Sequence, residues 1–212
     1  PLGQFVNLLR NGKPVRMSKR KGTMITFREL VDEVGPDAAR YTLISRSSNQ
    51  TIDFDIEAVK EKSQSNPVYY VQYAHARICS ILRKAAGVTL EQAELMGMEN
   101  VAVKAVDAVS ADEVDYSLLT DPTELALARK LSELQDLIAN CARDRAPFRL
   151  THYVEELAAD FHSFYQVCQV LPSEGRPVDP DVCRARLAAC DAVRSVLKLV
   201  LSLIGVSAPL SM

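Results

Sequence analysis

The sequence predicts a mainly helical protein, a helix bundle with a small extended piece at its N-terminal end. Apolar residues recur every three or four positions through most of the C-terminal half, as on one face of a helix. Capping residues and prolines separate these periodic segments. Near the start, Asn11-Gly12 lies between two apolar stretches and indicates a β-hairpin. Because amphipathic helices cannot bury their apolar faces singly, we expect them to pack together.

The N-terminal piece is expected to be extended chain around a turn, with Phe5 to Leu9 as the first strand. Six basic residues and no acidic residue lie between Arg10 and Gly22. A packed core would not accept this charge, so we expect this loop to be exposed or to bind anions.

Helix signals begin at Thr26, which forms a capping-box pattern with Glu29, and a first short helix should end at Gly35. A second helix should start at Pro36. After a loop over residues 47–54, Asp55 should cap a long helix that Pro67 kinks or splits and that ends at Gly87.

Residues 88–118 are acidic and weakly periodic, and we interpret them as short helices or a connecting insertion. Three amphipathic helices should follow, separated at Pro147 and by the Pro/Gly/acid-rich segment 172–180. The predicted division of the chain is an extended segment with the basic loop (1–27), a connecting helical region (28–87), an acidic insertion or linker (88–118) and a helical bundle (119–212).

Composition narrows the class of protein. The 212 residues are 48% hydrophobic, which is enough for a core, but the longest apolar stretch is interrupted by Lys198, Ser202 and Gly205, so we expect no membrane span. Five cysteines without a C-x-x-C pair favour reduced, buried thiols in a cytosolic protein over disulfides or zinc. The net charge is −2, yet residues 1–50 hold nine Lys/Arg against four Asp/Glu, so positive charge is concentrated near the N-terminus.

A basic segment resembles the K-M-S-K-S loop of class I aminoacyl-tRNA synthetases: Arg16-Met17-Ser18-Lys19-Arg20-Lys21-Gly22. The resemblance implies an ATP-binding loop over Arg16, Met17, Ser18, Lys19 and Arg20, with Lys19 as the catalytic lysine that neutralises charge developing on the phosphates. A compact ammonium on a flexible stem suits that role. Arg16 and Arg20 depart from the motif in a way that resembles the arginyl branch. The alternative is a solvated hairpin tip.

A longer string resembles the helix that follows this loop in arginyl-tRNA synthetases: Asn66-Pro67-Val68-Tyr69-Tyr70-Val71-Gln72-Tyr73-Ala74-His75-Ala76-Arg77. Helical spacing places Tyr70, Tyr73 and Arg77 on the same face as Asn66, and Val71, Ala74, Ile78 and Leu82 on another. The first face is predicted to contact tRNA. The alternatives are that this face braces the catalytic domain, or that it forms a satisfied Tyr/Arg network inside the bundle.

The C-terminal segment resembles the DALR anticodon-binding domain of arginyl and a few other class I synthetases, in Phe161 to Tyr165, Asp191-Ala192-Val193-Arg194 and Leu203 to Pro209. In that family an exposed aromatic and the terminal methionine lie near the anticodon loop, and Tyr165 and Met212 are the nearest matches. Aromatic rings stack on the unpaired bases of RNA loops. Alternatively, Tyr165 belongs to the core and Met212 is a frayed end.

The resemblance implies an enzyme that activates arginine with ATP and Mg²⁺ and transfers it to tRNA(Arg). Arginine and ATP would bind through a catalytic domain outside this chain, whose His-x-Gly-His motif does not occur here. We therefore expect the chain alone to be inactive, to hold no metal or cofactor firmly, and to belong to a monomeric, cytoplasmic protein without a membrane partner. The alternatives are another class I synthetase, such as the cysteinyl enzyme, and a non-catalytic helical RNA-binding module.

Overall fold

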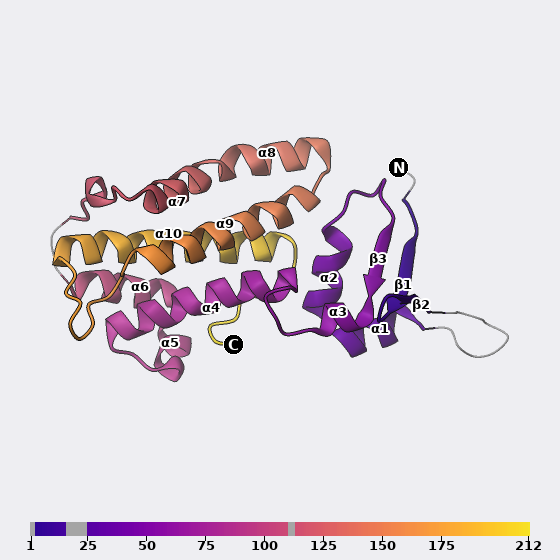
Figure 1. The fold of residues 1–212 in the computed structure, drawn as a ribbon, viewed down its shortest axis with the longest axis horizontal. Coiled ribbons are helices and arrows are strands. Elements are labelled where there is room, and N and C mark those ends of the chain that lie inside the picture. The colour runs from indigo at the N-terminus through magenta and orange to yellow at the C-terminus, as the bar shows by residue number, and fades with distance from the viewer. Residues whose placement is uncertain (1–2, 16–24, 110–112) are drawn as a thin grey trace.

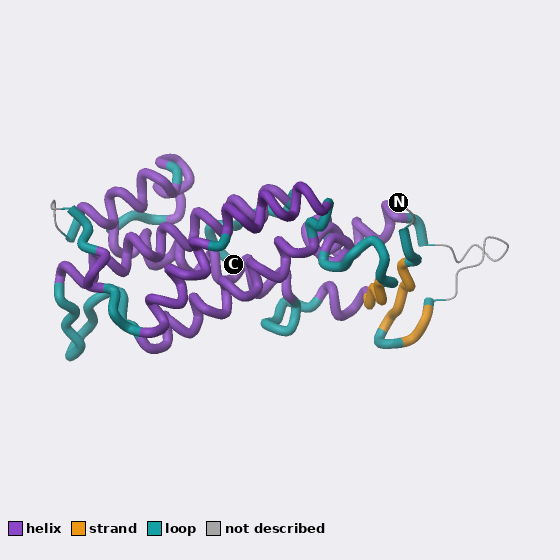
Figure 2. Tube along the Cα trace, turned by 90° about the horizontal axis from the view of Figure 1, so that it is seen from above, coloured by secondary structure: helices purple, strands orange, loops and turns teal. Residues whose placement is uncertain are grey.

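The computed structural model describes residues 3–15, 25–109 and 113–212. The molecule is elongated, with a bundle of long helices at one end and a small sheet with three short helices at the other (Figure 1). Seen from above, the long helices run roughly along the long axis and the strands lie beyond their ends (Figure 2). The predicted mainly helical fold with a small extended N-terminal part is confirmed.

The sheet has the order β2-β1-β3 and is built from β1 (Val6–Arg10), β2 (Lys13–Pro14) and β3 (Ile52–Asp55). The hairpin predicted at Asn11-Gly12 is confirmed, and both residues have the positive φ values, 51° and 73°, that this turn requires. The expected loop over residues 47–54 is wrong at its end, because β3 pairs in parallel with β1. A four-residue strand whose partner lies more than forty positions away has almost no local sequence signal.

Asp55 ties the hairpin turn to the helix that follows the sheet. Its carboxylate accepts hydrogen bonds from the backbone amides of Asn11 (3.2 Å) and Gly12 (2.6 Å) and from that of Glu57 (3.1 Å). These bonds hold the pKa of Asp55 below its usual value. The predicted cap at Asp55 is therefore confirmed, and it also fixes the base of the hairpin.

Three short helices pack against the sheet: α1 (Phe27–Val34), α2 (Pro36–Ile44) and α3 (Ile56–Lys60). The capping box of Thr26 and Glu29 is present, as predicted. Leu30, Phe54 and Ile56 form a small core of their own. Arg10, counted above among the loop's basic residues, pairs instead with Glu33 (2.8 Å) and Glu57, so it is not available to an anion.

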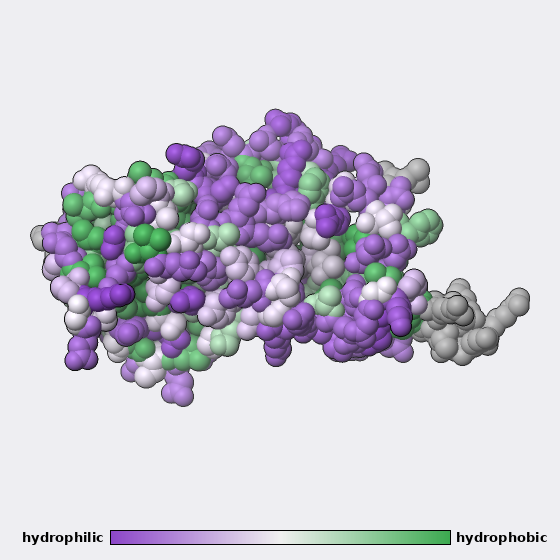
Figure 3. Space-filling view, viewed as in Figure 1, coloured by the Kyte–Doolittle hydropathy of each residue, from purple (hydrophilic) through white to green (hydrophobic). Residues whose placement is uncertain are grey.

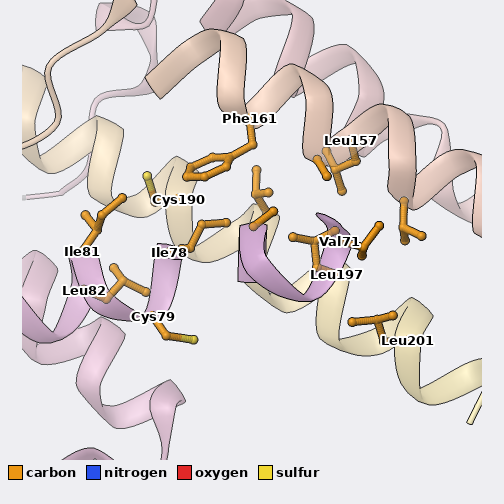
Figure 4. Packing of buried hydrophobic residues seen from close by; sticks show 14 of the residues in the cluster. Val71, Ile78, Cys79, Ile81, Leu82, Leu157, Phe161, Cys190, Leu197 and Leu201 are labelled. Carbon is orange, nitrogen blue, oxygen red and sulfur yellow. The ribbon is translucent and has the colours of Figure 1, made fainter. Parts of the chain in front are cut away.

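The bundle is organised around α4 (Pro67–Ala86), α9 (Phe148–Val167) and α10 (Pro180–Leu203). Phe161 of α9, Ile78 of α4 and Cys190 of α10 all point into the space between these helices (Figure 4). Each is fully buried, and burial of an apolar side chain of this size stabilises the fold by about 1.5–3 kcal/mol. The predicted split at Pro67 is confirmed, because α3 ends at Lys60 and α4 begins at Pro67.

Residues 88–118 contain α5 (Leu90–Met96), α6 (Met98–Asp107) and the short 3₁₀ helix η2 (Tyr116–Leu118). Short helices were one of the two interpretations offered for this segment. Met98, Val101 and Ala105 of α6 belong to the main core, and the interpretation of residues 88–118 as a connecting insertion stays a prediction. Small side chains such as alanine weaken the hydrophobic periodicity, so this packing has little local signal in the sequence.

The single helix predicted from Asp121 to Pro147 is interrupted at Glu133 and forms α7 (Pro122–Ser132) and α8 (Leu134–Asp144). The hydroxyl of Ser132 donates a hydrogen bond to the carbonyl oxygen of Arg129 at 2.7 Å. A serine that bonds back to its own helix bends it, and this bond accompanies the break. α8 then ends at Arg145, which has a left-handed backbone with φ of 53°.

In the motif Asp191 to Arg194, Val193 and Arg194 are buried side chains of α10. Val193 is fully buried and the Arg194 side chain is only 1% exposed. Asp191 accepts a hydrogen bond from Arg194 Nε at 2.8 Å, and Glu99 of α6 lies 3.7 Å from the same guanidinium. The motif therefore positions a buried cation where α10 meets α6.

The C-terminal tail joins the two ends of the molecule. Asp37 of α2 accepts a hydrogen bond from the Ser207 amide at 3.2 Å, and Gln72 of α4 donates to the Ser207 carbonyl at 3.0 Å. His75 Nδ1 donates to the carbonyl oxygen of Pro209 at 2.9 Å. Residues 207–209 thus bind both the sheet-bearing part and the bundle.

Acidification is expected to destabilise the chain through His75. Burial, partly offset by the bond to Pro209, lowers the pKa of His75 from 6.5, and Arg194 and Lys198 lower it further. Below about pH 6.5 the imidazole of the unfolded chain is protonated, whereas that of the native chain stays neutral. The free energy of unfolding should therefore decrease as the pH is lowered. Urea unfolding between about pH 8 and pH 5 should show a shallower dependence in His75→Gln than in the wild type.

The matched control for this experiment is His152→Gln, because His152 is exposed on α9. Its pH dependence should equal that of the wild type. His162, whose pKa is also lowered by burial, contributes to the pH dependence of the wild type and of both variants alike. Equal slopes for wild type and His75→Gln would contradict the assignment.

Candidate nucleic-acid interface

The basic signature segment Arg16, Met17, Ser18, Lys19 and Arg20 lies outside the described residues. The structure describes its flanks, which are the hairpin ending at Pro14 and the helix cap at Thr26. The roles assigned to these five residues, including that of Lys19, stay predictions.

Four of the five residues predicted to bind tRNA lie together, where α4 packs against α9. Tyr70, Tyr73 and Arg77 come from α4, and Tyr165 comes from α9. The Arg77 guanidinium carbon lies 4.4 Å from the centroid of the Tyr165 ring and 5.9 Å from that of Tyr73. All four side chains are partly buried, so each has a packed side and a side that faces solvent.

Two further aromatic residues complete this group, and the sequence reasoning missed both. His162 of α9 lies 5.1 Å from Tyr70 and 6.0 Å from Tyr73 between ring centroids. Tyr69 stacks on Tyr73 at 6.3 Å with an interplanar angle of 10°. Helical spacing could have found both, since Tyr69 precedes Tyr73 by four residues and His162 precedes Tyr165 by three. We call the group Tyr69, Tyr70, Tyr73, Arg77, His162 and Tyr165 the aromatic cluster.

The aromatic cluster carries one positive charge, that of Arg77, and contains no carboxylate. Burial, together with the charge of Arg77, lowers the pKa of His162, so the imidazole is neutral at neutral pH. Burial raises the pKa of Tyr70, followed by the effect of Asp160, so its hydroxyl stays protonated. The cluster offers flat rings, hydroxyl groups and one guanidinium, which is the chemistry that stacks on bases and holds phosphates.

The structure is consistent with both interpretations of these tyrosines, as a network within the bundle and as a surface for tRNA. Tyr70 packs on the main core, and Tyr165 packs on Phe161 with centroids 5.9 Å apart. Their solvent-facing sides remain open in the described structure, where Tyr73, Arg77 and Tyr165 line a surface depression of about 620 Å³. Bracing the bundle and presenting rings to a ligand are therefore compatible.

The depression continues from the aromatic cluster along α4 to the loop that follows α9. Beyond Tyr73, Arg77 and Tyr165 it is lined by Lys84 from the last turn of α4 and Arg176 from the loop. On the face drawn in Figure 3, hydrophilic and hydrophobic residues are mixed, and the hydrophobic patches lie mainly toward the end of the bundle away from the sheet.

Met212 and Asn66 lie apart from the aromatic cluster. Met212 is 54% exposed and lines a separate depression of about 660 Å³ together with Tyr69, Gln72 and Ser207. Tyr69 connects the two surfaces through its stacking on Tyr73. Asn66, placed on the same helical face by the sequence, is buried and donates to the carbonyl oxygens of Val59 (2.9 Å) and Glu61 (2.8 Å), so it holds the start of α4.

The cysteines and the possible metal ligands of the described residues form no further site. All five cysteines are buried and free, as expected. Among the described residues there is no group of His, Cys, Asp and Glu arranged to hold a metal ion. In the same part of the chain, none of the helices is long and apolar enough to cross a membrane.

Comparison with known families and proteins gives consistent matches. Residues 91–212 match the model of the DALR anticodon binding domain. The chain is 46% identical over 209 residues to an arginine–tRNA ligase of Staphylococcus epidermidis and 44% identical to one of Staphylococcus aureus. In each case 99% of this chain is matched, and the chain spans about a third (34%) of the relative's length.

Solved structures agree with these matches. The crystal structure of an arginyl-tRNA synthetase from Campylobacter jejuni superposes with a TM-score of 0.77 at 29% identity, covering 100% of this chain and 40% of that one. The arginyl-tRNA synthetase of Thermus thermophilus has a TM-score of 0.68 at 22% identity, covering 97% and 34% of the two chains, and this likeness supports the fold alone.

Proposed function

This chain belongs to the family of the DALR anticodon binding domain, and we propose that it is the tRNA-docking part of an arginine–tRNA ligase. The proposed reaction of the whole enzyme is activation of arginine with ATP and Mg²⁺, followed by transfer of arginine to tRNA(Arg). This chain would contribute the ATP-loop lysine Lys19 and the surface that binds the anticodon region. The enzyme is proposed to work as a monomer in the cytoplasm.

The observation that carries this proposal is the aromatic cluster. Tyr73 and Tyr165, from helices far apart in the sequence, both lie close to the Arg77 guanidinium carbon, at 5.9 and 4.4 Å between that atom and each ring centroid. Unpaired bases of an RNA loop stack on such rings and on arginine planes. Met212 lines a separate depression, which Tyr69 joins to the cluster by stacking on Tyr73, so Met212 would lie near the bound RNA.

Loss of a cluster ring is expected to weaken tRNA binding. Tyr73→Leu and Tyr165→Leu should each reduce the binding free energy of tRNA(Arg) by about 1–3 kcal/mol, since each removes one stacking surface. Leucine keeps part of the packing against the bundle. Equilibrium binding of labelled tRNA(Arg) to the chain measures the effect.

Tyr116→Leu is the matched control, because Tyr116 is a 61% exposed tyrosine on η2 outside the cluster. It should bind tRNA as the wild type does. Circular dichroism would show whether each variant keeps its helix content. If the two cluster variants bind as tightly as Tyr116→Leu, the cluster is not the tRNA surface.

A further inference from the structure

The depression beside the aromatic cluster has a charge that contrasts with the rest of the bundle. Residues 88–212 contain eleven Lys/Arg against nineteen Asp/Glu, so this half of the chain is acidic. The depression is lined by Arg77, Lys84 and Arg176, and none of its lining residues is acidic. Glu174 belongs to the same loop as Arg176 but does not line the depression.

Within the described structure none of the three cations has a carboxylate partner, a property that they share with Lys104 and Arg129; what sets them apart is that they line one depression together. Lys130, Arg186 and Lys198, for comparison, form ion pairs with Glu156 (2.9 Å), Glu124 (2.6 Å) and Glu99 (2.8 Å). Lys84 lies in the last turn of α4, where the helix dipole stabilises a positive charge. This dipole does not account for Arg176, which lies on a loop.

The loop that carries Arg176 is held in one shape by Gln169. Its side-chain amide donates to the carbonyl oxygens of Leu171 (2.9 Å) and Arg176 (3.0 Å) and to the Ser173 hydroxyl (3.1 Å). The backbone of Ser173 pairs with that of Arg176 in an isolated β-bridge. Because the loop is ordered by its own hydrogen bonds, little conformational entropy is lost when a ligand binds Arg176.

The position of the depression, next to the aromatic cluster, indicates which ligand it binds. It begins at Arg77, whose guanidinium lies on the Tyr165 ring, and extends along α4 to Lys84. A nucleotide stacked on the cluster is joined covalently to phosphates on both sides, and those phosphates must pass over the neighbouring surface. Unpaired lysine and arginine side chains bind such phosphates without reading the base.

We propose that the depression formed by Arg77, Lys84 and Arg176 binds the phosphodiester backbone of the RNA strand whose bases stack on the aromatic cluster. This inference rests on the proposed function and adds a sequence-independent subsite to it. Arg77 joins the two surfaces, because it contacts the rings and lines the depression. The subsite would add affinity for an RNA strand of any sequence to the affinity that stacking on the aromatic cluster supplies.

The experiment measures binding of an anticodon stem-loop RNA of tRNA(Arg) to the chain as a function of salt. Each phosphate contact in a single strand contributes about 0.7 to the slope of log K against log salt. Lys84→Gln and Arg176→Gln should each reduce the slope by about that amount, and by the same amount for a stem-loop with a different anticodon. Both residues are exposed, so neither substitution disturbs the core.

Lys104→Gln and Arg129→Gln are matched controls, since both residues are exposed and lie outside the depression. They should leave the slope unchanged. Tyr73→Leu, measured in parallel, should weaken binding with little change of slope.

The outcomes separate this inference from the proposed function. If Tyr73→Leu weakens binding while Lys84→Gln and Arg176→Gln leave the slope unchanged, the phosphate subsite is wrong and the tRNA surface stands. If none of the three variants alters binding, both the phosphate subsite and the proposed function are wrong. Displacement of the RNA by inorganic phosphate at constant ionic strength, with unchanged slopes, would assign the depression to a small anion and overturn the inference.

Discussion

Asp191→Ala is expected to lower the free energy of unfolding of the chain by about 3 kcal/mol, the upper end of the range for a hydrogen bond to a charged group. The substitution removes the carboxylate, 31% exposed, that accepts a hydrogen bond from the Arg194 guanidinium, 1% exposed. The remaining partners of Arg194 are the Ser195 hydroxyl at 3.0 Å and the Glu99 carboxylate at 3.7 Å, and Nη1 already has no hydrogen-bond partner in the described structure. A buried guanidinium nitrogen that loses its acceptor adds a desolvation cost to the lost bond.

A double-mutant cycle distinguishes this cause from loss of packing. Asp191→Ala combined with Arg194→Met removes the charge as well as its partner, and methionine fills much of the same volume. The double variant should therefore be more stable than Asp191→Ala alone. Urea unfolding followed by circular dichroism gives both values.

Asp136→Ala provides the surface comparison, because Asp136 is an exposed residue of α8. It should change stability by no more than about 0.5 kcal/mol. If Asp191→Ala is no more destabilising than Asp136→Ala, the pair does not hold α10 in place.

Lys19→Ala, made in an arginine–tRNA ligase that contains this chain, is expected to slow adenylate formation by about 10²–10³-fold. Removing one preorganised group aimed at charge that develops in the transition state costs about this much. Because the gain arises in the transition state, the affinity for tRNA(Arg) should hardly change. Arginine-dependent ATP–pyrophosphate exchange and a tRNA binding curve measure the two quantities.

Lys13→Ala is the nearest matched substitution. Lys13 is an exposed lysine of β2, close in sequence to the signature segment but outside its motif. It should retain nearly the exchange rate of the wild type. An equal rate for the Lys19 and Lys13 variants would contradict the catalytic assignment and would favour a solvated basic turn.

The sequence by itself determined several of the helix starts and ends, because their signals are local, although it missed the break between α7 and α8. The capping box at Thr26, the split at Pro67 and the start of α10 at Asp179-Pro180 each depend on residues within one helical turn. It also determined which residues of α4 face the core, since Val71, Ala74, Ile78 and Leu82 are all fully buried as their spacing predicts.

Only the tertiary structure decided what lies across from each helix. The parallel pairing of β3 with β1, the place of α6 in the core and the tail contacts of Ser207 with Asp37 join residues that are distant in the chain. The aromatic cluster depends on this as well: Tyr73 and Arg77 were predicted from one motif and Tyr165 from another, and the packing of α4 on α9 makes them one surface. Spacing along a helix fixes which face a side chain occupies, whereas the partner of that face is set by long-range packing, which no local pattern encodes.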